Sequence, residues 1–160
     1  MVMRSIRLKI SDLAAVAGYT RFQMDGLIKQ VFGRSLGKIA GTQRSYSPQD
    51  LLVVSVITKM EQRFAVDRKS LARISDSLRA VLSGPRSANR HARLLATFDP
   101  PVVRYLESSD SVDEGIVVAL GEVFSRVDEY LGVSSAGLEA RQAPLPMPPI
   151  SVPGRPSRSG

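Results

Sequence analysis

Few residues in this 160-residue chain have the chemistry that catalysis needs. There is no Cys, and His91 is the single His, so the chain offers no thiolate nucleophile, no disulfide and no multi-histidine metal site. The carboxylates Asp110, Asp113 and Glu114 are grouped closely enough to hold Mg²⁺ for phosphoryl chemistry. They lie in a Ser-rich segment with no second carboxylate group on a rigid element, which favours a hydrated turn. With no Gly-rich phosphate loop, triad or activated Lys, we expect no enzymatic activity, metal or cofactor.

Binding chemistry is better represented, because the chain is basic and its charge is unevenly spread. The net charge is +7, but residues 1–93 carry +11, residues 94–140 carry −7 and the last 20 residues carry +3. A basic part beside an acidic part is typical of a polyanion-binding module joined to a module that avoids the polyanion or meets another partner. Alternatively, the basic residues only solvate helix faces. The periodicity of the sequence distinguishes these two interpretations.

The first two elements expected are short helices joined by a tight turn. One lies between Ile10 and Gly18, with Ser11 as its cap and the glycine as its left-handed stop. The second starts after Thr20, and its apolar face has helical spacing through Met24, Leu27, Ile28 and Val31. Such a pair is typical of a helix-turn-helix, whose second helix leaves one face free for the DNA major groove.

A small hairpin and two longer helices are expected next. Glycines at 33, 37 and 41 alternate with basic and apolar residues, which predicts a hairpin with a basic tip over residues 33–44. Such a hairpin would be the wing of a winged helix. Ser47 followed by proline predicts the start of a helix that runs to about Phe64, and a further helix is expected over residues 67–83.

The last part of the chain has a different character. Residues 86–93 form a basic linker, and short strands are expected over residues 94–98, 102–106 and 116–120. A helix with an apolar stripe follows and stops at Gly132. Six of the last 20 residues are Pro, so residues 133–160 are predicted to be a disordered tail. The fold class expected is mainly α with small β: a winged helix-turn-helix domain (1–85), the linker, a small α+β module (94–132) and the tail.

Residues 8–83 resemble the DNA-binding domain of the MerR-type family of winged-helix transcriptional regulators. The resemblance rests on residues 9–14 with Gly18, on residues 44–51 and on residues 64–74, and residues 44–51 are its most specific part. It implies duplex binding, with residues 20–31 in the major groove and the loop around Lys38 against the DNA backbone. The chain departs from the family where many members have Arg-Tyr-Tyr, since it reads RFQM from Arg21, and it lacks the family's long dimerisation helix.

On this basis we predict two sets of functional residues. The DNA-contacting set consists of Arg21, Phe22, Lys29, Arg34, Lys38, Arg44 and Tyr46. For Phe22 the alternative is a core position facing the wing, which is the more common role of such a residue; for Tyr46 packing under the wing is an equally open alternative. The dimerisation set is the helical stripe of Val123, Phe124, Val127, Tyr130 and Leu131, which together with the short strands has more apolar surface than so small a module can cover.

The function expected is that of a sequence-specific, duplex-DNA-binding transcriptional regulator that acts as a homodimer and can meet a protein partner through residues 94–131. Two alternatives stay open: an excisionase-like architectural or recombination accessory factor, and an adaptor whose basic face docks an acidic protein. The longest apolar stretch, residues 51–57, is too short to cross a membrane, and Asp12 interrupts any signal core. We therefore expect a cytoplasmic, nucleoid-associated protein.

Overall fold

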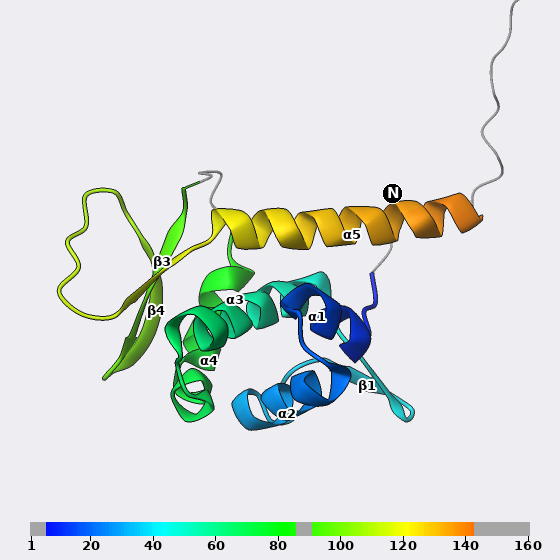
Figure 1. The fold of residues 1–160 in the computed structure, drawn as a ribbon, viewed down its shortest axis with the longest axis horizontal. Helices are drawn as coiled ribbons and strands as arrows, with labels where there is room; N and C mark the ends of the chain where they lie inside the picture. The colour runs from blue at the N-terminus through cyan, green and yellow to red at the C-terminus, as the bar shows by residue number, and fades with distance from the viewer. Residues whose placement is uncertain (1–5, 86–90, 143–160) are drawn as a thin grey trace, which may run out of the picture.

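The computed structural model describes residues 6–85 and 91–142, except for the side chains of residues 133–142. Within these residues the fold is mixed α and β, with five helices, a two-stranded hairpin and a three-stranded antiparallel sheet (Figure 1). In chain order the elements are α1 (Ile10–Ala17), α2 (Arg21–Val31), β1 (Lys38–Ala40), β2 (Gln43–Ser45), α3 (Pro48–Phe64), α4 (Arg68–Ser83), β3 (Arg93–Phe98), β4 (Pro101–Leu106), β5 (Ile116–Ala119) and α5 (Gly121–Gln142).

Local capping signals explain where most of the helices begin. The predicted caps Thr20 and Ser47 are confirmed, because each hydroxyl accepts a hydrogen bond from the backbone N–H three residues later. The prediction that Ser11 caps the first helix is wrong. That helix begins one residue earlier, and the Asp12 carboxylate accepts the N–H of Lys9 at 2.7 Å, so the acid in the first turn closes the helix end.

Helix α3 is the centre of the core. Nine of its 17 residues are buried, and it packs against α1, α4 and α5. The apolar side chains of the helices and of the sheet form one continuous cluster. The hydrophobic core therefore contains residues from before and after the predicted linker (86–93), and Ala92 within that segment is buried in it; residues 86–90 lie outside the described residues.

The three-stranded sheet has the order β4-β3-β5, and the three predicted strands are confirmed. On one face, Leu94 lies opposite both Tyr105 and Val118. This face packs on α4, where the Ser77 hydroxyl accepts the backbone N–H of Val103 at 2.8 Å. The sheet is thus attached to the helices by its strand edge as well as by apolar contact.

Helix α5 is longer than we predicted. It passes through Gly132 and ends at Gln142, so a stop at Gly132 and a tail disordered from residue 133 are wrong for residues 133–142. A glycine inside a helix costs only about 1 kcal/mol relative to alanine, and the next Pro is Pro144, beyond the helix end. Residues 143–160 of the predicted tail lie outside the described part of the chain.

The apolar stripe of α5 lies against the chain's own helices. Val123, Phe124 and Val127 are buried, while Tyr130 and Leu131 are partly buried against the same core. The Tyr130 hydroxyl donates to the Asp12 carboxylate at 2.5 Å, and this hydrogen bond raises the pKa of Tyr130 to about 12. The premise that this stripe is an uncovered dimer face is therefore incorrect: three of its five side chains are buried within the chain and the other two are partly buried.

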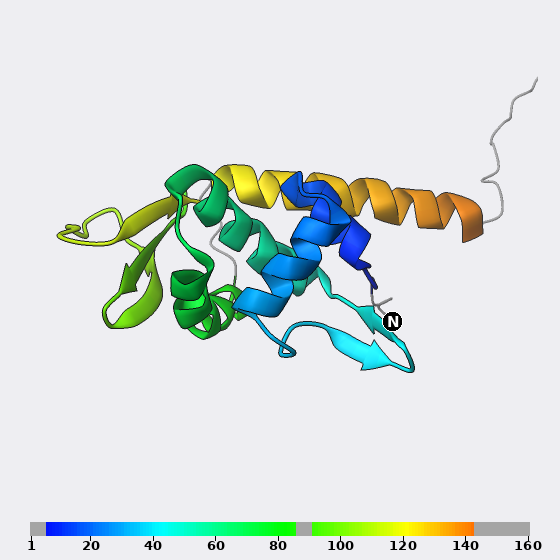
Figure 2. The same ribbon diagram turned by 60° about the horizontal axis from the view of Figure 1, so that its bottom comes forward.

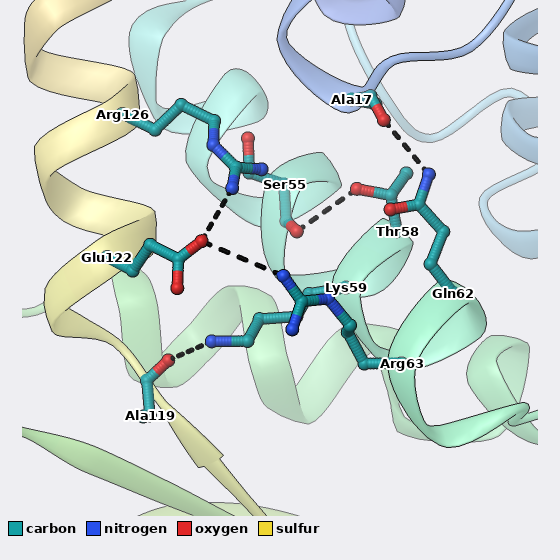
Figure 3. A network of polar contacts seen from close by, with 9 residues as sticks. All are labelled: Ala17, Ser55, Thr58, Lys59, Gln62, Arg63, Ala119, Glu122 and Arg126. Carbon is teal, nitrogen blue, oxygen red and sulfur yellow. Dashed lines mark hydrogen bonds and ion pairs between the residues drawn. The ribbon is translucent and has the colours of Figure 1, made fainter.

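Polar contacts also join α3 to the start of α5 (Figure 3). The Lys59 ammonium donates to the carbonyl oxygen of Ala119 at 2.8 Å, just before α5 begins. Burial lowers the pKa of Lys59. Glu122 pairs with Arg126 at 2.8 Å and more distantly with Arg63 at 3.9 Å. These contacts fix the start of α5 beside the C-terminal part of α3.

Candidate nucleic-acid interface

A basic cleft of about 780 Å³ lies between the start of α1, helix α2 and the β1–β2 hairpin. Among the described residues that line it, five are basic and one, Asp25, is acidic; the basic ones are Lys9, Arg21, Lys29, Arg34 and Arg44. Figure 2 shows α2 and the hairpin on the side of the molecule opposite α5. The arrangement gathers four of the predicted basic contacts on one surface and places the α5 stripe away from it.

Helix α2 presents an outward face of mixed chemistry. Its predicted apolar face is confirmed as buried. Arg21 and Lys29 are exposed, and Phe22 is 87% exposed, so the alternative in which Phe22 packs in the core is wrong. Lys29 pairs with Asp25 one turn earlier at 2.8 Å, an exposed ion pair that is easily exchanged for another anion.

The hairpin and the segment before it bring Arg34 and Arg44 to the other wall of the cleft, whereas Lys38 lines a neighbouring hollow beside Ile39. Its strands pair Lys38 with Ser45 and Ile39 with Arg44, and Gly41 takes the left-handed φ of +65° that the tight turn requires. Lys38 and Arg34 are exposed. Residues 26–49, which run from the second half of α2 through the hairpin, contain four basic residues and no acidic residue, so this stretch of the chain attracts anions.

Two of the predicted contacts also hold the hairpin in place. The Arg44 guanidinium donates to the carbonyl oxygen of Leu36 at 2.7 Å. Tyr46 is buried, which raises its pKa, and its backbone pairs in both directions with Leu8 at 2.8 Å. Its ring lies so close to Gly37 that a Cβ there would come within 2.9 Å of it. Of the two alternatives for Tyr46, the structure has the one in which the side chain packs under the hairpin.

The sequence reasoning missed Lys9 and Arg79. Lys9 lines the cleft at the start of α1. Arg79 of α4 donates to both the hydroxyl and the carbonyl oxygen of Ser35, at 3.1 and 3.2 Å, and so anchors the segment that leads into the hairpin. A cation next to the first predicted helix was visible in the sequence. The contact between residues 35 and 79 had no local signal.

A hydrogen-bonded cluster fixes the turn between α1 and α2 onto α3 and α4. The Glu61 carboxylate accepts from the Tyr19 hydroxyl and from the Arg68 guanidinium, the latter at 2.7 Å. Desolvation opposes the charged carboxylate, but the hydrogen bonds from Arg68 and Tyr19 together lower the pKa of Glu61. Burial and the bond to Glu61 raise the pKa of Tyr19. Helix α2 is therefore held rigidly while its outer face stays open.

The carboxylates considered for metal binding have other roles. Asp110 accepts from the backbone N–H of Glu107 and pairs with Arg104 at 2.9 Å, and these contacts lower its pKa. Asp113 and Glu114 are exposed. No group of three or more metal-ligating side chains occurs among the described side chains of residues 6–85 and 91–132, and no helix in the described part of the chain has the length and apolarity to cross a membrane.

Comparison of the sequence with protein-family models and with curated proteins finds no match. The function of the cleft therefore has to be argued from its own residues and their geometry.

Proposed function

We propose that the chain is a sequence-specific, duplex-DNA-binding transcriptional regulator that places α2 in the major groove and the β1–β2 hairpin against the adjacent backbone. The observation that carries the proposal is the cleft between these two elements, lined by five basic side chains against one acidic one. The order of elements, a helix pair, a hairpin and a second helix pair, also agrees with the winged helix-turn-helix that the resemblance to the MerR-type family implies.

The residues on the two walls have complementary tasks in this proposal. An α-helix is about 10–12 Å across and fits a major groove about 12 Å wide. Near the start of α2, Arg21 has the fork of donors that reads the O6 and N7 atoms of guanine, and Phe22 offers an apolar surface to a thymine methyl. Lys29, Arg34 and Lys38 supply cations to the phosphates on either side, which sets the position of the protein without reading sequence.

Symmetric binding by two copies remains a prediction. A single small DNA-binding unit buries limited surface, and doubling is the common route to tight specific binding. Because Val123, Phe124 and Val127 of the α5 stripe are buried within the chain, we propose that a dimer uses another surface.

The direct test is fluorescence anisotropy with duplexes selected from a random pool, measured across a range of salt concentrations. For about five phosphate contacts we expect a log-log slope of roughly −4 to −5. Arg21→Ala and Lys29→Ala should weaken binding roughly 10-fold or more while leaving the melting temperature unchanged, because both side chains are exposed.

Arg126→Ala is the matched control, since it removes one exposed arginine from α5, on the opposite side of the molecule (Figure 2). Its affinity should stay within about twofold of the unmodified chain. An affinity that does not change with salt, or an equal loss in all three variants, would contradict the proposal. Duplex DNA that fails to displace a bound acidic protein would favour the adaptor function instead.

A further inference from the structure

The two most exposed large apolar side chains in the described residues both belong to the elements that form the basic cleft. Phe22 on α2 is 87% exposed and Ile39 on β1 is 63% exposed, whereas the next, Val102 on the sheet, is 42% exposed. Phe22 already has a partner in the proposed function. Ile39 has no contact assigned to it in the proposed function, although its exposed neighbours in the hairpin are all polar, basic or small.

The base of the hairpin is fixed while its tip is open. Arg79 holds Ser35 on one side, and the backbone of Tyr46 is paired with Leu8 on the other. All residues from 38 to 43 are exposed. The hairpin is therefore a short, anchored projection that does not need to be ordered when it meets a partner, which lowers the entropic cost of binding.

The register of the strands sets which side chain projects from this tip. Directly opposed residues share one face of an antiparallel pair, so Ile39 and Arg44 lie on the same face. The guanidinium of Arg44 is bonded back to Leu36, which leaves Ile39 as the exposed apolar side chain of this pair. An isoleucine is also stiff about its first side-chain torsion, since it is branched at Cβ.

We infer that Ile39 is a wedge that enters the DNA minor groove and separates two stacked base pairs, so that the duplex is kinked when the hairpin docks. The inference rests on the proposed function. Aliphatic side chains inserted between base steps in this way bend DNA toward the major groove, and nearby cations hold the phosphates on both sides. Lys38 is such a cation, and Arg7 and Arg79 line the same hollow as Ile39, against one acidic residue, Asp50, whose carboxylate accepts the backbone N–H of Ser47.

The same chemistry predicts which DNA the hairpin favours. Pyrimidine–purine steps such as TA and CA unstack most easily, so the preferred site should carry one of them beneath the hairpin. The binding site would then have a sequence requirement at base pairs that α2 does not touch. One complex would combine the regulatory function with the DNA bending of the architectural alternative.

The experiment measures the bend by energy transfer between dyes on the two ends of a duplex selected with the full chain. The unmodified chain should shorten the end-to-end distance. Ile39→Ala should reduce the bend by half or more and weaken binding roughly 3- to 10-fold without changing the salt slope, because no charge is lost. Lys38→Ala should make the log-log salt slope less negative and leave the DNA bend unchanged. Val102→Ala, which shortens an exposed apolar residue on β4, is the control and should change neither.

The possible failures can be told apart. A straight duplex in the complex with the unmodified chain, or an undiminished bend with Ile39→Ala, overturns the wedge but leaves DNA binding intact. A loss of affinity with no change in bend also overturns it, and makes Ile39 an ordinary surface contact. Absence of any duplex binding at low salt overturns the proposed function itself. Melting curves of each variant verify that the fold is retained, as expected for substitutions at exposed positions.

Discussion

The substitution Val127→Ala tests whether the apolar face of α5 packs in the core of its own chain or forms an interface with a second copy. The Val127 side chain is 1% exposed and lies with Val123 and Phe124 on the face of α5 turned toward α3. Val127→Ala removes two buried methyl groups, worth about 0.8 kcal/mol each, and leaves a small cavity, so we expect a loss of about 2–3 kcal/mol. At roughly 3–5 °C per kcal/mol for a chain of this size, the melting temperature should fall by roughly 6–15 °C.

The assay is urea denaturation followed by circular dichroism, with light scattering on the same samples. Glu129→Ala is the control on the exposed face of the same helix and should change stability by less than about 0.5 kcal/mol. Val127→Asp should prevent folding or cost several kcal/mol, because it buries a carboxylate without a partner. Unchanged stability of Val127→Ala, together with a loss of molecular mass by light scattering, would refute the packing argument and restore the stripe as a dimer surface.

Three further predictions concern the cleft and its supports. Asp25→Asn should tighten duplex binding roughly 2- to 10-fold at low salt, because it removes the acidic residue that lines the cleft and frees Lys29 from its ion pair. Fluorescence anisotropy measures the affinity, and an unchanged value would argue against a DNA-facing α2. Because the folded-state pKa of Glu61 lies below its ordinary 4.5, its stabilising contribution is present above that value and is lost as pH falls through the folded pKa. Glu61→Gln should therefore flatten the fall in stability below about pH 5 in acid titrations of unfolding, and an unchanged slope would contradict this. Gly37→Ala should destabilise the hairpin by about 1–3 kcal/mol, because φ is +82° and the new Cβ would lie 2.9 Å from Tyr46, with Gly41→Ala as a control that has the strain but not the clash.

The sequence predicted the elements well where the signals are local. Caps at Thr20 and Ser47 and the apolar face of α2 depend on residues three or four apart, and each was confirmed. The end of α5 was missed because a glycine was treated as a stop, although a single glycine inside a helix carries only a modest cost. An apolar stripe shows that a helix face is covered, but the sequence does not say whether α3 or a second chain covers it.

The candidate site was predictable in its residue types and less so in its geometry. Arg21 and Lys29 were expected on the outer face of α2 and are exposed there. For Phe22 and Tyr46 the sequence left two readings open, because an aromatic side chain next to a turn suits both core and surface. The roles of Arg44 and Arg79 in holding the hairpin depend on contacts with residues 8 and 44 positions away, for which one sequence contains no signal.

The contact between Tyr130 and Asp12 joins residues 118 positions apart, and it has a consequence for the order in which the protein matures during synthesis. The helices that form the cleft leave the ribosome first, but α3, on which α1 packs, is also packed against α5, whose buried residues are Val123, Phe124 and Val127. Until those residues emerge, apolar α3 side chains are open to chaperones and to other nascent chains. The segment of the protein proposed to hold DNA is thus translated early and becomes stable late, after most of the chain has been made.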